Sequence, residues 1–164
     1  MKVGEYCRRA VVTIHGDATI YEAARTMRDH HVGFLVVLDR NNLTRTPIGV
    51  LTDRDIVVQV DARSVDVNSV AVSDVMTRQP VLAYEDDDLH DLMQGMHAAG
   101  VRRVPVIDAA GALTGMIAVD DVFEIVAGLM QNVCGSIATE HRIERETRSL
   151  MANQVDPDGG EASR

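Results

Sequence analysis

Aromatic side chains are almost missing from this sequence: it has no tryptophan, and phenylalanine and tyrosine together make up 3% of its 164 residues. Proteins that bind single-stranded nucleic acid need aromatic surfaces on which bases stack, so this class is disfavoured. The net charge of −9 also disfavours DNA, RNA and anionic membranes as bulk partners, because phosphates attract lysine- and arginine-rich faces. The apolar mass is aliphatic, which is typical of buried strands packed on helices.

Cysteine is scarce as well. Cys7 and Cys134 lie far apart and neither has a second cysteine at metal-ligand spacing, so neither a disulfide framework nor a zinc site is indicated. Residues 1–9 lack the apolar segment of a signal peptide, and no apolar run approaches the roughly 18 residues that span a bilayer. We therefore expect a cytoplasmic protein without a membrane segment.

Common enzyme motifs are absent too. The sequence contains no phosphate-binding Gly-x-x-x-x-Gly-Lys, no His-Glu-x-x-His and no Gly-x-Ser-x-Gly. The acidic run at 86–91 could suggest a metal site, but acidic residues at a helix N-terminus have the same composition. We expect a protein that is not an enzyme, with no catalytic residues and no metal.

The chain contains an internal repeat. Residues 27–39 match residues 96–108, which lie 69 positions later, and each segment opens with Met and closes with Asp. A glycine-led segment follows in each copy, at 49–55 and 115–121. A unit of about 60 residues buries too little surface to fold alone, so we expect the copies to share a core.

Both copies predict the element order β-α-β-β-α, an α+β fold with helices on one side of a sheet. A first strand is expected at 11–14 and again at 80–83, and helical spacing of apolar residues follows each. The closing helices are expected at 53–60 and 120–130, and the chain still looks helical beyond them. The expected divisions are residues 1–66 (first repeat with linker), 67–135 (second repeat) and 136–164 (a charged helical extension and a disordered tail).

The segment Gly49–Asp55 combines a strand end with a helix start. Thr52 lies at the junction, where its hydroxyl caps the helix or contacts a ligand. Asp55, in the first turn, can accept hydrogen bonds from a pair of ribose hydroxyls, and Gly49 permits close backbone approach. The alternative is an ordinary capped helix without a ligand.

These features resemble tandem CBS domains, the module named for cystathionine β-synthase and often called a Bateman module. The resemblance rests on Asp74–Thr77, Val104–Asp108 and Gly49–Asp55, and it covers about residues 3–130. It implies two repeats related by pseudo-twofold symmetry, with adenine nucleotides or adenosyl ligands in two clefts between them. It also implies a homodimer.

The resemblance implies two unequal clefts. In the strong site, a carboxylate holds ribose, apolar strands wall the adenine and an arginine meets phosphate. The residues expected there are Gly49, Thr52, Asp55, Pro80, Val81, Val101, Arg102 and Arg103. Because strand side chains alternate, we expect one of the two arginines to reach the ligand directly. The alternative for both is a solvated edge or an inter-repeat ion pair.

The second cleft departs from the family pattern, because Ala118 replaces the hydroxyl residue and the opposing strand has no basic side chain. We expect this site to be weak or empty. The residues expected there are Val11, Val12, Val32, Gly33, Phe34, Gly115, Ala118 and Asp121.

The sequence therefore predicts a regulatory module that senses AMP, ADP, ATP or a related adenosyl ligand, requires no cofactor and acts on an effector protein of unknown identity. The alternative is a structural or adaptor dimer that uses the helix at 120–137 for protein contacts. A third hypothesis, a nucleotide hydrolase, would rely on the acidic residues.

Overall fold

The computed structural model describes residues 1–41 and 44–154, with side chains up to Met151. The chain divides into two compact units. The first is Met1–Asp121, and the second begins at Val122.

The first repeat has the predicted order of elements. Thr19 starts its first helix with a capping box, because its hydroxyl accepts from the Glu22 N–H at 3.1 Å while the Glu22 carboxylate accepts from the Thr19 N–H at 2.8 Å. The helix then buries its apolar face against the sheet. The elements are β1 (Thr13–His15), α2 (Ile20–His30), β2 (Phe34–Leu38), β3 (Pro47–Thr52) and α3 (Asp53–Gln59).

The second repeat follows the same order, so the predicted β-α-β-β-α duplication is confirmed. Corresponding helices end alike: α2 is capped by His31 and α5 by Gly100, 69 positions later, and both have left-handed backbone. The elements are β5 (Ala83–Tyr84), α5 (Leu89–Ala99), β6 (Arg103–Ile107), β7 (Leu113–Ala118) and the start of α6 (Val119–Gln154).

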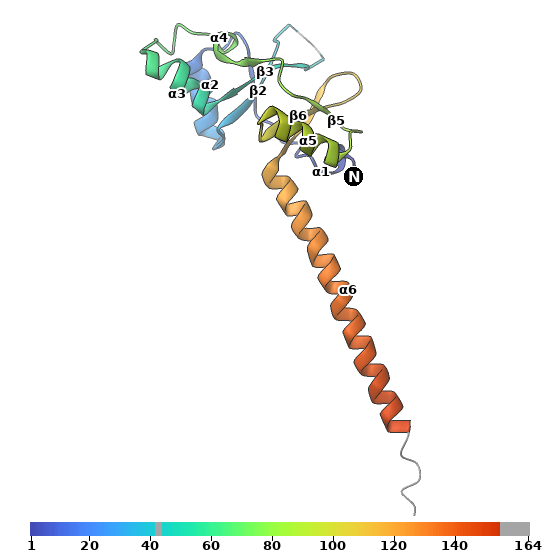
Figure 1. Ribbon diagram of the computed structural model, residues 1–164. Coiled ribbons are helices and arrows are strands. Elements are labelled where there is room, and N and C mark those ends of the chain that lie inside the picture. The colour runs from blue at the N-terminus through green and yellow to red at the C-terminus, as the bar shows by residue number, and fades with distance from the viewer. Residues whose placement is uncertain (42–43, 155–164) are drawn as a thin grey trace, which may run out of the picture. The chain divides into compact units, whose positions relative to one another are not determined.

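Each repeat adds a segment to the sheet of the other. The four-stranded sheet has the order β1-β2-β3-β4, and its last strand, β4 (Thr77–Arg78), belongs to the segment that leads into the second repeat. In the opposite direction, Arg8 forms an antiparallel bridge with Met116 at the edge of the sheet β5-β6-β7. Helix α1 (Val3–Tyr6) accordingly lies beside β5 (Figure 1). The exchange joins the repeats into one unit.

An aliphatic core forms between the first sheet and its helices. Ile20 on α2 and Val72 on α4 (Val72–Val75) are fully buried together with Leu35 and Leu51 of the strands. A backbone hydrogen bond fixes α4 next to this core, because the Val72 N–H donates to the Ala18 carbonyl at 2.8 Å. The predicted aliphatic interior is therefore confirmed. The strands packed in it carry the candidate site at their ends.

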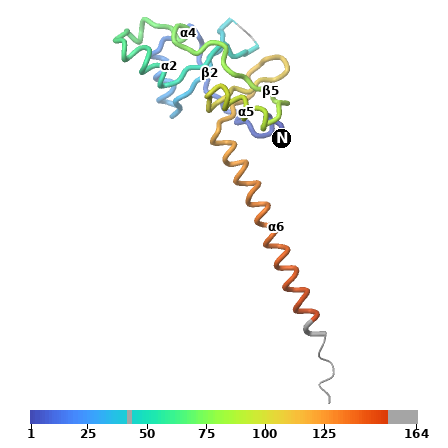
Figure 2. Tube along the Cα trace, in the orientation of Figure 1, coloured from blue at the N-terminus to red at the C-terminus, as the bar shows by residue number. Residues whose placement is uncertain are grey.

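The expected closing helix at 120–130 and the expected helical extension after it form a single helix, α6. It continues without a break through 36 residues to Gln154 and includes the charged segment (Figure 2). The tail expected at 154–164 lies, beyond Gln154, outside the described residues. Over Val119–Met151 the helix is long and apolar enough, by length and composition, to cross a membrane; the mean hydropathy of its 18-residue window is 1.3. Counting uninterrupted apolar runs missed this window, because Gln131 and Asn132 break the run. The expectation concerned uninterrupted apolar runs, whereas this window meets the length and composition by its average hydropathy.

Candidate ligand-binding site

A cleft of about 530 Å³ lies between the two repeats in the first unit. Seven of the residues predicted for the strong site line it: Thr52, Asp55, Pro80, Val81, Val101, Arg102 and Arg103. The cleft therefore brings together residues that lie up to 51 positions apart in the sequence, as the resemblance implied.

Gly49 does not line this cleft. A Cβ atom built there would lie 2.4 Å from the Met76 Sδ and 2.9 Å from the Thr77 carbonyl oxygen. The close backbone approach that Gly49 permits is therefore the approach of the segment at 76–77, which pairs with β3, and not that of a ligand.

The strand register explains the cleft residues that sequence reasoning missed. Phe34 lies opposite Thr52, and Val50 lies opposite Thr77, so these four side chains share one face of the sheet. Period-two spacing from Thr52 would have found Val50, and the same spacing from Arg103 would have found Pro105; the cross-strand partners needed the register. The missed residues are Phe34, Val50, Arg54, Thr77, Gln79, Ala99, Gly100 and Pro105.

Thr52 and Asp55 form a capping box at the start of α3. The Asp55 Oδ2 accepts from the Thr52 N–H at 2.9 Å and from the Thr52 hydroxyl at 2.7 Å, while the Asp55 N–H donates to that hydroxyl at 3.1 Å. The capping interpretation is thus confirmed. In the part of the chain that the structure describes, no group donates to Oδ1, so the second carboxylate oxygen keeps its full capacity to accept hydrogen bonds.

The cleft has a basic wall. Arg102 and Arg103 both line it, together with Arg54 at the start of α3. The Arg103 guanidinium lies 6.0 Å from the centroid of the Phe34 ring, at the outer limit of a cation–π contact. Within residues 1–41 and 44–151, no carboxylate lies within ion-pair distance of Arg102 or Arg103. The guanidinium groups are therefore available to an anion.

A second cleft has a volume of about 180 Å³ and shares Phe34 and Arg103 with the first. Of the residues predicted for the weak site, Val11, Val12, Val32, Gly33 and Phe34 line it. Gly115, Ala118 and Asp121 do not. The opposing strand has no basic residue, as expected, but Arg103 of the second repeat reaches this cleft.

Asp121 is buried, with 6% of the residue exposed, and its carboxylate accepts hydrogen bonds from within the protein. Its Oδ2 accepts from the Ala118 N–H at 2.8 Å, and its Oδ1 accepts from the Arg8 Nε at 2.5 Å. The ribose-binding role implied for Asp121 would require the ligand to displace the Arg8 guanidinium from this carboxylate.

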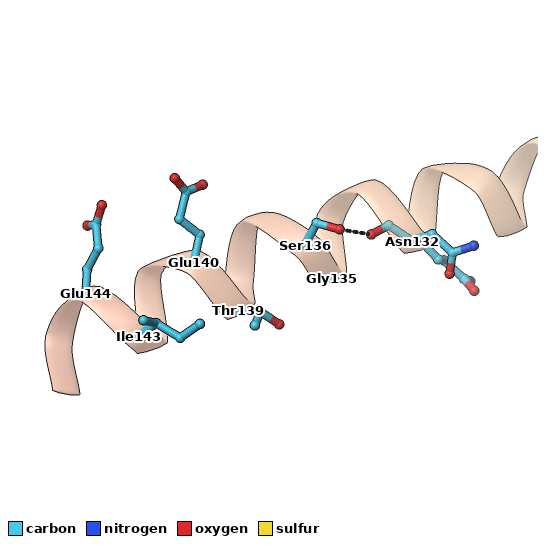
Figure 3. Close-up of a pocket in the computed structure, with 8 residues that line it drawn as sticks. Asn132, Gly135, Ser136, Thr139, Glu140, Ile143 and Glu144 are labelled. Carbon is cyan, nitrogen blue, oxygen red and sulfur yellow. Dashed lines mark hydrogen bonds between the residues drawn. The ribbon is translucent and has the colours of Figure 1, made fainter. Parts of the chain in front are cut away.

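A shallow hollow follows one side of α6 (Figure 3). Its lining comes from that helix alone, and the Ser136 hydroxyl points back to the Asn132 carbonyl, to which it donates at 3.1 Å. A single helix has no second wall with which to enclose a small molecule. We therefore place no ligand site on α6.

Other candidates from the sequence have structural roles. In the acidic run, Asp88 caps α5 by accepting from the His90 N–H at 2.8 Å. Among the described residues, no group of three His, Cys, Asp or Glu side chains is arranged to hold a metal ion. Partial burial raises the pKa of the Cys7 thiol, which opposes thiolate formation.

Comparison with known proteins identifies the family to which this chain belongs. The CBS domain family model matches residues 3–61 and 72–128, so the chain belongs to the CBS-domain family and carries a tandem pair. An uncharacterized protein of Methanopyrus kandleri is 31% identical over 134 residues, which are 81% of this chain and 66% of that relative. The chain thus spans about two thirds of that relative's length.

Solved structures share the fold. A CBS domain protein from Pyrobaculum aerophilum, complexed with AMP, aligns with a TM-score of 0.67 at 26% identity and covers 74% of this chain and 89% of its own. A hexameric CBS-CP12 protein from bloom-forming cyanobacteria aligns with a TM-score of 0.65 at 28% identity, covering 75% and 69%. The chain is therefore a pair of CBS repeats related by pseudo-twofold symmetry, followed by a C-terminal helix.

Proposed function

We propose that this chain is a regulatory module that binds an adenosine-containing ligand, such as AMP, ADP or ATP, in the cleft between its two repeats. The observation that carries this proposal is the convergence, in one cleft, of an acceptor, a basic wall and apolar strands. Asp55 supplies an open carboxylate oxygen, Arg102 and Arg103 supply cations, and Pro80 and Val81 supply an apolar wall. The volume of about 530 Å³ lies within the range of small-ligand sites.

Each group has a chemical role in the proposed complex. The Asp55 Oδ1 accepts hydrogen bonds from the ribose hydroxyls, which a carboxylate can receive as a pair. A guanidinium donates to phosphate oxygens in charge-assisted hydrogen bonds. The adenine lies against the apolar strand ends, where its faces leave water.

The related structure from Pyrobaculum aerophilum, which holds AMP, supports an adenosine ligand for this cleft. A ligand there contacts both repeats at once, so its affinity depends on how they are arranged. A ligand that binds one arrangement more tightly shifts the population toward it. We propose that this shift is the regulatory output, passed to an effector protein in the cytoplasm, and that the chain performs no catalysis and needs no cofactor.

Isothermal titration calorimetry tests the proposal directly. AMP, ADP, ATP and S-adenosylmethionine are titrated into the full chain, and thermal unfolding is followed in parallel, because a ligand that binds only the folded state raises the unfolding temperature. We expect saturable heat and a concentration-dependent rise in that temperature for at least one of them. If none of them binds at millimolar concentration, the proposal is wrong.

A second candidate function, assembly of identical chains through α6, is favoured by the apolar face of this helix. Phe123, Val126, Met130, Val133 and Ile137 are spaced alternately by three and four residues, and each is 46–68% exposed within the chain. This spacing is typical of helices that pack along a seam with another helix. The hexameric state of the related cyanobacterial protein supports a second copy of the chain as the partner.

Light scattering of the full chain tests the assembly. We expect an oligomer that Val133→Glu dissociates, because a charge would be buried in the seam, whereas Gln131→Glu, on another face, leaves it intact. A monomeric wild-type chain would contradict this function. So would wild-type protein that remains monomeric in buffer and co-sediments with phosphatidylcholine vesicles, because the apolar face would then cover lipid instead of a second copy.

A further inference from the structure

The two clefts are related position by position, yet they differ in size. Every residue that lines the second cleft has a counterpart in the first; for example, Val11 and Val12 correspond to Pro80 and Val81, 69 positions later. The second cleft is nevertheless only about 180 Å³, against about 530 Å³ for the first. It lacks the end at which Asp55 lies in the first cleft.

At the end that the second cleft lacks, Arg8 occupies the position that Thr77 has in the first cleft. Thr77 pairs with Val50 of β3 and lines the first cleft, whereas Arg8 pairs with Met116 of β7. The Arg8 pairing is reciprocal, with backbone hydrogen bonds of 2.8 and 2.9 Å to Met116. Thr77 and Arg8 therefore occupy equivalent positions at the edges of the two sheets. Position 77 carries a short hydroxyl side chain, and position 8 carries a guanidinium.

Neighbouring residues support this equivalence. A Cβ atom at Gly49 would meet the sulfur of Met76, and one at Gly115 would meet the sulfur of Cys7 at 2.6 Å. Both glycines let the same kind of segment approach the sheet. The segment at 7–8 therefore lies as close to β7 as the segment at 76–77 lies to β3.

The guanidinium occupies the acceptor that a ligand would use. Arg8 donates to the Asp121 Oδ1, the atom that corresponds to the open Oδ1 of Asp55. The Asp121 side chain is only 8% exposed, while that of Arg8 is 61% exposed. A separate hollow of about 50 Å³ is lined by Arg102, Arg103, Ala118, Val119 and Asp120, and Asp121 does not line it.

We infer that Arg8 acts as a specificity-determining residue that closes the second cleft, so that the chain takes one adenosine ligand and not two. A buried carboxylate that loses its cation needs a partner, and neutral ribose hydroxyls are weaker donors to it than a guanidinium. The identity of the residue at positions 8 and 77 then decides which cleft binds. This inference rests on the proposed function for the nature of the ligand.

The test exchanges the residues at the two equivalent positions: threonine is placed at position 8 of the second cleft, and arginine at position 77 of the first. AMP is titrated into the wild-type chain, Arg8→Thr, Asp55→Ala, the double variant Asp55→Ala/Arg8→Thr, and the reciprocal variant Thr77→Arg. Circular dichroism and thermal unfolding establish that each is folded, and Arg8→Ala replaces Arg8→Thr if the threonine variant is not. We expect one tight site per chain in the wild type and two in Arg8→Thr. Asp55→Ala should keep one site, weakened by about 10- to 100-fold, and the double variant should have one tight site beside that weakened one. Thr77→Arg should bind at least tenfold more weakly than the wild type.

The outcomes separate this inference from the proposed function. If the wild type binds one AMP and Arg8→Thr also binds one, with only the weakened first site in the double variant, the inference is wrong and the proposed function stands. Two sites in the wild type, or weaker AMP binding in Arg8→Thr, would show that Arg8 admits or holds the nucleotide and would overturn the inference. If neither the wild type nor any variant binds AMP, both proposals fail.

Discussion

Replacement of the two equivalent aspartates should separate binding from stability. Asp55→Ala removes the open carboxylate oxygen of the first cleft, and a hydrogen bond to a charged group is worth about 1.5–3 kcal/mol. We therefore expect AMP affinity to fall by about 10- to 100-fold, since about 1.4 kcal/mol corresponds to a factor of ten. The same substitution breaks the capping box with Thr52, which costs roughly 1 kcal/mol of unfolding free energy.

Asp121→Ala should behave in the opposite way. Asp121 is 6% exposed and accepts from the Ala118 N–H and from Arg8. Its removal leaves the partly buried Ala118 N–H without this acceptor, at a cost of about 1–3 kcal/mol. AMP affinity at the first cleft should change less than threefold, because that cleft does not contain Asp121.

Calorimetry and urea denaturation of both variants measure the two effects on the same samples. The expected pattern is a large loss of affinity with a small loss of stability for Asp55→Ala, and the reverse for Asp121→Ala. Equal losses of affinity in the two variants would refute the reasoning, because the second carboxylate would then contribute to binding as much as the first.

Three further predictions follow from other contacts. Gly115→Ala should lower the unfolding free energy by about 1–3 kcal/mol through overpacking against the segment at 7–8, whereas Gly95→Ala, where a Cβ meets nothing within 4 Å, should raise it by roughly 0.5–1 kcal/mol; equal effects in urea denaturation would contradict the close approach. The hydrogen bond from Arg9 lowers the pKa of Glu85 from its ordinary value of 4.5, so the stabilisation is present above that value and is lost as the pH falls through the lowered pKa. The stability difference between wild type and Glu85→Gln should therefore vanish in acid, and a difference that persists there would exclude the ion pair as its source. Arg102→Gln/Arg103→Gln should weaken AMP binding by about 10- to 100-fold by loss of charged hydrogen bonds and leave adenosine binding nearly unchanged; equal losses for both ligands would show that the arginines do not meet phosphate.

Local patterns determined much of this protein from the sequence alone. The 69-residue repeat predicted two β-α-β-β-α units, and the Thr52–Asp55 spacing predicted a capped helix at a strand end. These predictions succeeded because capping and amphipathic periodicity depend on residues a few positions apart. The residues of the first cleft followed from the family resemblance, apart from Gly49, whose close contact is with Met76.

Only the tertiary structure decided the features that depend on distant segments. Arg8 and Asp121 are 113 positions apart, and their pairing follows from the exchange of edge segments between the two sheets, which no local pattern encodes. Phe34 and Arg103, which lie 69 positions apart in the sequence, likewise line both clefts. The sequence predicted an unequal pair of sites from Ala118. The structure adds a difference between the two carboxylates: Asp121 accepts a hydrogen bond from the Arg8 guanidinium, whereas Asp55 accepts only from Thr52 among the described residues.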